Sequence, residues 1–391
     1  MENLKEKALD LHKEIQGKIS TELKTKLENK DDLSLVYSPG VAEPCKKIHE
    51  NEDDAYVYTG KANTIAVISD GTAVLGLGNI GPKAALPVME GKACLFKKFG
   101  GLNAVPLVID TTDTEEIIKF VKQVSPTFGG VNLEDISSPR CIEIETRLKE
   151  ELDIPVFHDD QHGTAIVTIA ALINSLKLVN KKPEECNVVI SGVGAAGSSI
   201  VRMLNDFGIN DIYAFNSRGI LREDEKYSKD LYNKLSKETN KENKNLTLEE
   251  AMADADIFVG VSVPNKVSKE MVKSMRRDPI VLAMANPDPE ITYEDAKEAG
   301  ARVVGTGRSD YPNQVNNVLA FPGLFKGALS VHATKITEKM KVAAAEAIAS
   351  LIPDEKISED YVIPSAFDLG VADVVAEAVA KCAREEGISQ K

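Results

Sequence analysis

Hydrophobic and polar positions alternate with two different periods along the first half of this 391-residue chain. Short apolar runs bounded by polar residues are typical of buried strands, and they occur as NTIAVISD (63–70), AVPLVID (104–110) and IPVFHD (154–159). Between them, TEEIIKFVKQV (114–124) and CIEIETRLKEEL (141–152) carry apolar residues three and four apart, which indicates amphipathic helices. Strands that alternate with helices in this way predict a parallel sheet and therefore an α/β fold.

The same alternation continues after a long apolar segment at about 163–179, which predicts a helix. Residues 1 to about 30 read as one charged helix, and the highly charged run 222–245 reads as a solvated surface excursion. After about residue 330 the pattern becomes helical. Further strand-like segments are CNVVIS (186–191), DIYAFNS (211–217), ADIFVGVS (255–262), PIVLAMANP (279–287) and ARVVGTG (301–307).

The glycine pattern G-x-G-x-x-G occurs twice, as GLGNIG (76–81) and GVGAAG (192–197). Only the second copy follows a strand-like segment, opens a helical one and precedes another strand at the usual distance, as a dinucleotide site requires. The first copy is followed at once by Pro82, and we interpret it as a tight turn that lets backbone approach a neighbour. The residues predicted to bind the dinucleotide are Gly192, Gly194, Ala195, Ala196 and Gly197.

The strand after the second glycine loop leaves the choice between NAD and NADP open. It ends in Asn216, Ser217 and Arg218, where an NAD site usually has an acidic residue. Ser217 and Arg218 could hold a 2′-phosphate; alternatively, Asn216 binds the ribose hydroxyls and Arg218 faces solvent.

These patterns divide the chain into three parts. We expect an N-terminal α/β domain for substrate and metal over 1–161, a Rossmann-type doubly wound parallel-sheet domain over 162–330, and a C-terminal helical segment over 331–391.

The composition argues against several kinds of partner. The net charge is −14 and no concentrated basic stripe occurs, so neither nucleic acid nor an anionic membrane surface is expected to bind. The five cysteines are scattered without a C-x-x-C pair, which fits reduced thiols in a cytoplasmic protein. The N-terminus lacks the apolar segment of a signal peptide, and the most apolar window, 164–179, is interrupted by polar residues.

Acidic residues at two strand ends are candidates for a metal site. Glu134 and Asp135 follow one strand-like segment, and Asp159 and Asp160 follow another. Oxygen ligands suit Mg²⁺ or Mn²⁺, whereas zinc is less expected without paired cysteines. Because neighbouring residues on a strand point to opposite faces, Asp159 and Asp160 should not chelate one ion together.

Two histidines, His158 and His162, flank these aspartates. Gly163 and Thr164 resemble a helix start, which would place both histidines before the helix rather than on one of its faces. We therefore interpret them as capping or surface residues rather than metal ligands.

Lys92 and Tyr37 are further candidates for proton transfer. Lys92 lies in an apolar stretch, and a lysine buried beside a cation has a lowered pKa and can act as a base. Tyr37 precedes a Pro-Gly turn that would hold its side chain rigidly. From the residues alone, a solvated charge is an equally acceptable interpretation of Lys92, and an ordinary packed side chain is the default interpretation of Tyr37.

Taken in order, several long motifs resemble the malic enzymes of the short bacterial type. The resemblance runs from about residue 30 to about residue 385. The motifs are YSPGVAEPC (37–45), ISDGTAVLGLGNIG (68–81), MEGKACLFKKFGG (89–101), GGVNLEDISSPRCIEIE (129–145), PVFHDDQHGTAIV (155–167), SGVGAAGSSI (191–200), AMANPDPEI (283–291) and GTGRSDYPNQVNNVLAFPG (305–323).

The resemblance implies oxidative decarboxylation of (S)-malate to pyruvate and CO₂, with reduction of NAD or NADP and a requirement for Mg²⁺ or Mn²⁺. It implies that Lys92 is the base, with Asp159 as its partner, and that Tyr37 is the acid that protonates the enol product. The implied metal ligands are Glu134, Asp135 and Asp160. Implied substrate contacts are Asn286, Asn316 and Asn317, and Asn286 is also assigned to the cofactor site.

One departure concerns Ala73, where larger relatives of this kind carry an arginine that clamps a substrate carboxylate. An asparagine or a residue from a partner subunit would have to replace it, and the resemblance suggests a homodimer or a higher assembly. Two alternatives stay open. One is malolactic conversion to lactate with retained cofactor, and the other is a non-catalytic Rossmann protein that senses a ligand.

Overall fold

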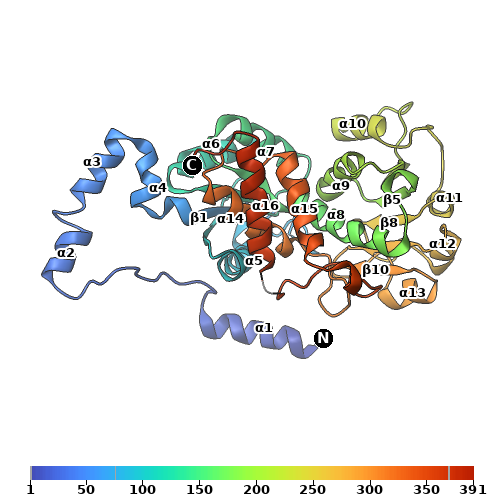
Figure 1. Ribbon diagram of the computed structural model, residues 1–391, viewed down its shortest axis with the longest axis horizontal. Helices are drawn as coiled ribbons and strands as arrows, with labels where there is room; N and C mark the ends of the chain where they lie inside the picture. The colour runs from blue at the N-terminus through green and yellow to red at the C-terminus, as the bar shows by residue number, and fades with distance from the viewer. Residues whose placement is uncertain (1, 75, 369) are drawn as a thin grey trace.

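Two parallel sheets form the body of the protein, as the alternation of strands and helices predicted (Figure 1). The computed structural model describes residues 2–74, 76–368 and 370–391. The first sheet has the strand order β2-β1-β3-β4, and all its pairs are parallel. Its strands are β1 (Thr64–Ser69), β2 (Asn103–Val108), β3 (Gly130–Leu133) and β4 (Val156–His158).

Helices cover both faces of this sheet, which explains why its central strands are continuously apolar. On one face, α6 (Thr114–Val124) and α7 (Arg140–Glu151) share a core cluster with β3. Asp113 caps α6 by accepting a hydrogen bond from the Glu116 backbone N–H at 2.9 Å. On the other face, α5 (Pro82–Leu95) continues into a π-helical turn, η3 (Phe96–Gly100), whose Phe96 lies in the main core.

The second sheet has the order β10-β9-β8-β5-β6-β7, and β7 alone among its described strands runs antiparallel. Because β6 and β8 lie on opposite sides of β5, the strand order reverses there, and ligands bind at such a point in open α/β sheets. The strands are β5 (Asn187–Ser191), β6 (Asp211–Asn216), β7 (Gly219–Ile220), β8 (Ile257–Gly260), β9 (Ile280–Ala283) and β10 (Val303–Thr306).

Helices again pack against both faces of this second sheet. The charged run predicted at 222–245 contains a short helix, α10, rather than only an irregular excursion. The helices are α9 (Ala195–Asp206), α10 (Asp230–Glu238), α11 (Leu248–Ala253), α12 (Lys269–Ser274) and α13 (Tyr293–Glu298).

The helix α8 (Asp159–Val179) leads from the first sheet to the second through one continuous core. By length and composition it could cross a membrane, with a mean hydropathy of 1.4, but 72% of that window is buried in the protein. Two predicted C-terminal helices are confirmed as α15 (Glu338–Ser350) and α16 (Val371–Glu385). α16 packs on α14 (Phe321–Ser330), where a Cβ on Gly327 would lie 2.5 Å from the Ala376 carbonyl oxygen, so glycine permits the close approach.

The N-terminal segment forms an arm that extends from the body (Figure 1). The prediction of one helix to about residue 30 is wrong, because the chain takes left-handed conformations at Gln16 and Gly17 and ends the first helix there. Residues 4–63 contain no buried side chain. The arm consists of α1 (Glu2–Ile15), α2 (Lys30–Val36), α3 (Ala42–Glu50) and α4 (Ala55–Tyr58), joined by irregular or 3₁₀-helical segments.

Candidate active site

Three carboxylates meet at the carboxyl end of the first sheet. Glu134 and Asp135 follow β3 directly, and Asp160 lies in the first turn of α8 after β4. One oxygen from each lies within 4.8 Å of the others. Asp135 has a left-handed φ of 54°, which aspartate tolerates better than most residues, and its backbone N–H donates to Asp160 Oδ2 at 2.8 Å. The strand end and the helix start are thereby joined.

The chemistry of this cluster fits a hard divalent cation. Burial, together with the charges of Asp160 and Glu134, raises the pKa of Asp135 to about 9. The Asp135 Oδ2 atom is buried and has no hydrogen-bond partner among the described residues. Gathering carboxylates in this way is costly without a cation, and oxygen ligands are those that Mg²⁺ and Mn²⁺ prefer.

Lys92 of α5 lies beside the cluster, with its Nζ 2.8 Å from Glu134 Oε1 and 2.6 Å from Asp159 Oδ2. The ammonium group also lies 4.3 Å from the centre of the Phe321 ring. Burial lowers the pKa of Lys92, but the neighbouring carboxylates outweigh it and hold that pKa above its ordinary value. A lowered pKa was expected for Lys92 beside a cation. The protein groups around it are anions, and they raise its pKa instead.

Asp159 is fully buried, and Asn317 donates a hydrogen bond to its Oδ2. Burial raises the pKa of Asp159 to about 7. A Cβ on Gly163, one turn later in α8, would lie 2.1 Å from Asp159 Oδ1, so glycine makes room for this carboxylate. Asn316 instead caps the next 3₁₀ turn, η6 (Asn317–Leu319), by accepting from the Val318 N–H at 3.0 Å.

The helix start predicted at Gly163 is wrong, because α8 begins at Asp159. His158 thus ends β4, and His162 lies in α8. As expected, the Asp159 and Asp160 side chains have different partners: Asp159 contacts Lys92, and Asp160 belongs to the carboxylate cluster. The reason is their position in a helical turn rather than on a strand. Neither histidine belongs to the carboxylate cluster, but the prediction of capping or surface roles is wrong, because both are buried and the His158 side chain makes no cap hydrogen bond.

The second glycine loop joins β5 to α9 at the point where the strand order reverses. A Cβ on Gly197 would lie 1.9 Å from the Gly192 carbonyl oxygen, so this glycine is required for the loop itself. A Cβ on Gly194 would meet nothing within 4 Å, which leaves open space before the N-terminus of α9. A backbone of this kind can approach the pyrophosphate of a dinucleotide.

These two glycines give a matched pair of variants. We expect Gly194→Ala to keep the melting temperature of the protein while weakening dinucleotide binding about tenfold, because its methyl group occupies only the ligand's space. Gly197→Ala should lower the melting temperature as well, since the added methyl meets backbone. Calorimetric melting and titration with the dinucleotide check both, and unchanged dinucleotide affinity in Gly194→Ala would contradict the assignment of this loop.

At the end of β6, the Asn216 side-chain oxygen accepts from the backbone N–H groups of Arg218 at 2.7 Å and Gly219 at 3.1 Å. This turn occupies the Asn216 oxygen, while Ser217 and Arg218 stay exposed. The first glycine loop is a turn, as predicted, with left-handed conformations at Gly76, Gly78 and Gly81 among its described residues.

Asn286, after β9, lies close to both halves of the protein. A Cβ on Gly307 would lie 2.6 Å from Asn286 Nδ2, and a Cβ on Gly76 would lie 3.2 Å from the adjacent Pro287. Glu290, within the motif 283–291, was not among the predicted site residues. It is a fully buried carboxylate that accepts from the backbone N–H groups of Ser262 at 2.7 Å and Ala285 at 3.1 Å. Its bonds hold the segments after β8 and β9 at the predicted dinucleotide site.

Arg140 is another residue that motif reading did not single out. Its Nη2 donates to Asp70 Oδ2 at 2.8 Å and to Thr72 Oγ1 at 3.0 Å, and thereby fixes the turn that carries Ala73. The Ala73 N–H donates to the Asp135 carbonyl at 2.9 Å, so this turn adjoins the carboxylate cluster. The sequence signal that could have identified Arg140 is its position between the acidic pairs Glu134–Asp135 and Asp159–Asp160, because a cation there can contact acidic strand ends.

Tyr37 is not brought to this site within one chain. Its side chain is 68% exposed, and it follows α2 at the outer part of the arm, apart from α5 and Lys92 (Figure 1). The structure therefore gathers Lys92, Glu134, Asp135, Asp159, Asp160 and Asn317, and leaves Tyr37 outside that group.

Comparisons with known proteins agree with this arrangement. The malic enzyme N-terminal domain family matches residues 16–149, and the malic enzyme NAD binding domain family matches residues 161–384. The chain is 58% identical to the bifunctional malic/malolactic enzyme of Bacillus subtilis, covering 99% of this chain and 95% of that protein. It is 53% identical to the NAD-dependent malic enzyme of Geobacillus stearothermophilus, covering 100% of this chain and 81% of that protein.

Solved structures give the same result. The crystal structure of a malic enzyme from Pyrococcus horikoshii superposes with a TM-score of 0.94 at 47% identity, covering 99% of this chain and 92% of that chain. Other relatives, at 44% to 46% identity, are named NADP-dependent malic enzymes. With both family domains matched in order and relatives this similar over nearly the full length, the chain belongs to the malic enzyme family.

Proposed function

We propose that the protein converts (S)-malate to pyruvate and CO₂ with NAD or NADP as the hydride acceptor and Mg²⁺ or Mn²⁺ bound by Glu134, Asp135 and Asp160. The observation that carries the proposal is the contact between a proton-transfer pair and a carboxylate cluster. Lys92 lies 2.6 Å from Asp159 and 2.8 Å from Glu134, a member of that cluster.

In this proposal Lys92 accepts the proton of the malate hydroxyl after passing its own to Asp159. Asn317 orients Asp159 through its hydrogen bond, and Phe321 covers the Lys92 ammonium group. A bound divalent cation supplies Lewis-acid stabilisation of negative charge on the substrate oxygens. The loop Gly192–Gly197 would hold the dinucleotide, which would supply the hydride acceptor for the oxidation of malate.

Steady-state kinetics with NAD and NADP side by side, with and without Mn²⁺, tests the function. Reduced nicotinamide and pyruvate should form in equal amounts, and only when Mn²⁺ or Mg²⁺ is present. Lactate without net reduced cofactor would instead support the malolactic activity that appears in the name of the Bacillus relative. Absence of turnover with either dinucleotide would contradict an enzymatic role.

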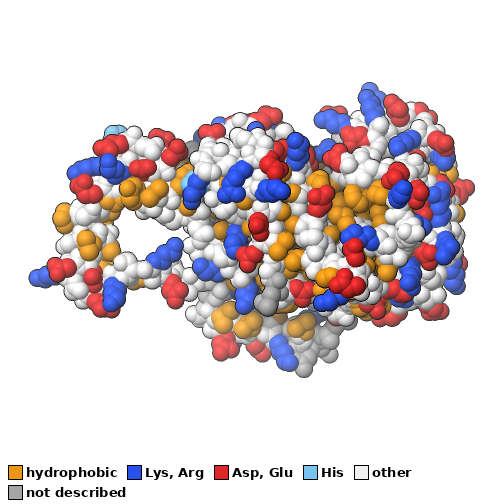
Figure 2. Space-filling view, in the orientation of Figure 1, with side chains coloured by type: hydrophobic (Ala, Val, Ile, Leu, Met, Phe, Trp, Pro, Cys, Tyr) orange, Lys and Arg blue, Asp and Glu red, His pale blue; other side chains and the backbone are white. Residues whose placement is uncertain are grey.

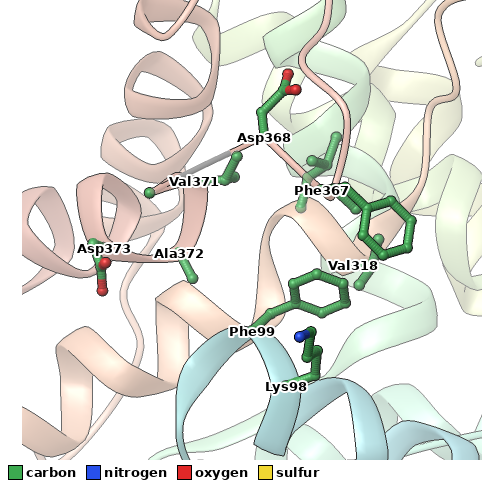
Figure 3. A pocket seen from close by; sticks show the side chains of 11 residues that line it. Lys98, Phe99, Val318, Phe367, Asp368, Val371, Ala372 and Asp373 are labelled. Carbon is green, nitrogen blue, oxygen red and sulfur yellow. The ribbon is translucent and has the colours of Figure 1, made fainter.

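We further propose that the protein works as a homodimer in which the arm of one copy covers the other. Large exposed apolar patches often mark protein–protein contacts, and Figure 2 shows hydrophobic side chains at several places along the arm. The body offers a pocket of mixed lining beside the candidate site, where Phe99 and Phe367 meet edge to face, Val318 follows Asn317, and Lys98, Asp368 and Asp373 add charges (Figure 3). The exposed large side chains of the arm are Leu4, Leu9, Leu11, Ile15, Ile19, Leu23, Leu27, Leu33, Leu35, Tyr37, Val41, Val57 and Tyr58.

A dimer of this kind would let the partner's arm supply the acid that the site lacks. We expect Tyr37→Phe and Lys92→Met to be nearly inactive alone. Co-expressed, they should recover about a quarter of wild-type activity, because half of the random dimers are mixed and each has one complete site. The control pair, Lys92→Met with Asp159→Asn, should recover nothing, since both changes affect the same group of side chains. Failure of the first pair to recover activity would contradict the role of the partner.

A further inference from the structure

A chain of buried polar side chains joins the candidate site to the cofactor helix, and the mechanism proposed above does not use it. His162 Nε2 lies 2.8 Å from Glu145 Oε2, and His162 Nδ1 lies 2.9 Å from Ser199 Oγ and 3.1 Å from Lys341 Nζ. All four residues are at most 5% exposed. We call Glu145, His162, Ser199 and Lys341 the junction network; they come from α7, α8, α9 and α15.

The hydrogen-bond chemistry assigns the direction of this network. A lysine ammonium group can only donate, so His162 Nδ1 is the acceptor, and Lys341 and the Ser199 hydroxyl share its single lone pair. The proton of the neutral imidazole therefore lies on Nε2 and is donated to Glu145. Glu145 Oε1 also accepts from the His158 backbone N–H at 3.0 Å and pairs with Lys149 at 2.7 Å. Every member thus has one fixed role, which favours a single relative placement of the four helices.

The network spans the two halves of the proposed reaction. His162 lies two residues after Asp160 on α8, whose first turn enters the carboxylate cluster. Ser199 lies two residues after Gly197 on α9, whose N-terminus faces the predicted dinucleotide site. Lys341 of α15 contacts the same nitrogen of His162 that Ser199 contacts, and it pairs with Glu338 at 2.6 Å.

Burying a lysine among helices costs desolvation energy that apolar residues of the same volume would avoid. α8 and α9 already share an apolar core, so adhesion alone does not require the network. A directional set of bonds adds what apolar contacts lack, namely one preferred register of α9 against α8.

We propose that His162 and Lys341 are positioning residues: His162 holds α9 in register with α8 through Ser199, and Lys341 holds the His162 ring in the orientation that this contact needs, so that the hydride acceptor is aligned with malate at the carboxylate cluster. The inference rests on the function proposed above. Neither residue is assigned to contact with substrate or dinucleotide, and both act through the helices that carry the groups that do.

The test replaces Lys341 with methionine, which keeps the volume and removes the donor. Misalignment by about 1 Å can cost about 100-fold in rate, so we expect kcat to fall about 10- to 100-fold while the dissociation constants for Mn²⁺ and for the dinucleotide change less than about threefold. Malate deuterated at C2 should show a larger isotope effect on kcat than with the wild type, because hydride transfer becomes slower relative to the other steps. Lys341→Arg should recover part of the rate, since it restores a donor.

Lys177→Met is the matched control, because this lysine lies on the far part of α8 and makes an exposed ion pair with Asp354. It should leave kcat and the isotope effect unchanged. If Lys341→Met folds poorly, Ser199→Ala replaces it in the test. This variant removes a single hydroxyl, and we expect it to lower kcat and raise the isotope effect. Unchanged kcat and isotope effect in a folded Lys341→Met protein would overturn the proposal.

Amide hydrogen exchange separates this proposal from the proposed function. Exchange along α9 should be faster in Lys341→Met and unchanged in Lys177→Met, whether or not the protein turns over malate. An inactive wild type with this exchange pattern would count against the function alone. Equal exchange in Lys341→Met and the wild type would count against the positioning role.

Discussion

Lys92→Met is expected to reduce kcat for malate oxidation about 100- to 10,000-fold, the range that a positioned proton-transfer group contributes. Methionine keeps most of the side-chain volume but removes the amine that lies 2.6 Å from Asp159. Because the Lys92 ammonium group also lies 2.8 Å from Glu134, its removal should leave Mn²⁺ binding intact or make it tighter. Steady-state kinetics combined with Mn²⁺ titration would separate loss of the base from loss of the metal site.

Lys97→Met is the matched control for this variant. Lys97 lies five residues further on, is exposed, and bonds only Asn103 among the described residues. It should keep wild-type kinetics. Full turnover in a folded Lys92→Met protein would remove Lys92 from the mechanism.

Asp160→Asn should weaken Mn²⁺ binding about 100-fold and lower activity at ordinary metal concentrations by a similar factor. The change removes one negative charge from the cluster while keeping an oxygen that can accept the Asp135 N–H. The backbone between β3 and α8 should therefore stay in place. Saturating Mn²⁺ should restore part of the rate, and titration of activity against Mn²⁺ measures this.

Asp110→Asn provides the control, because Asp110 also follows a strand of the first sheet but is exposed and outside the cluster. Its metal dependence should match the wild type. If Asp160→Asn had wild-type affinity for Mn²⁺, the proposed ligand set would be wrong, whatever the activity of the protein.

Much of the fold follows from local pattern. Apolar runs such as 64–69 and 187–191 formed the predicted buried strands, because parallel strands covered on both faces need apolar side chains throughout. The second glycine loop formed the predicted strand-to-helix turn, because Gly197 has no room for a Cβ. Chain breaks were harder to predict: the first helix ends at Ile15, where Gly17 is a stop signal that the charged helical pattern on both sides of it obscured.

The start of α8 was predicted at Gly163, but Gly163 lies inside the helix. Glycine is unfavourable within a helix, and it is present here because its missing side chain makes room for Asp159 and Asn317. Asn317 is more than a hundred residues away in the sequence, so no local pattern could have indicated this need.

The sequence by itself determined the elements, the glycine loop and the acidic residues at the strand ends, because spacing and residue type control local structure. Only the tertiary structure decided how charges meet. It gave Lys92 carboxylate neighbours that raise its pKa, placed His162 between Glu145 and Lys341, and left Tyr37 on an exposed arm. These outcomes depend on contacts between residues distant in sequence, and electrostatic interactions depend on those distances and on burial rather than on order along the chain.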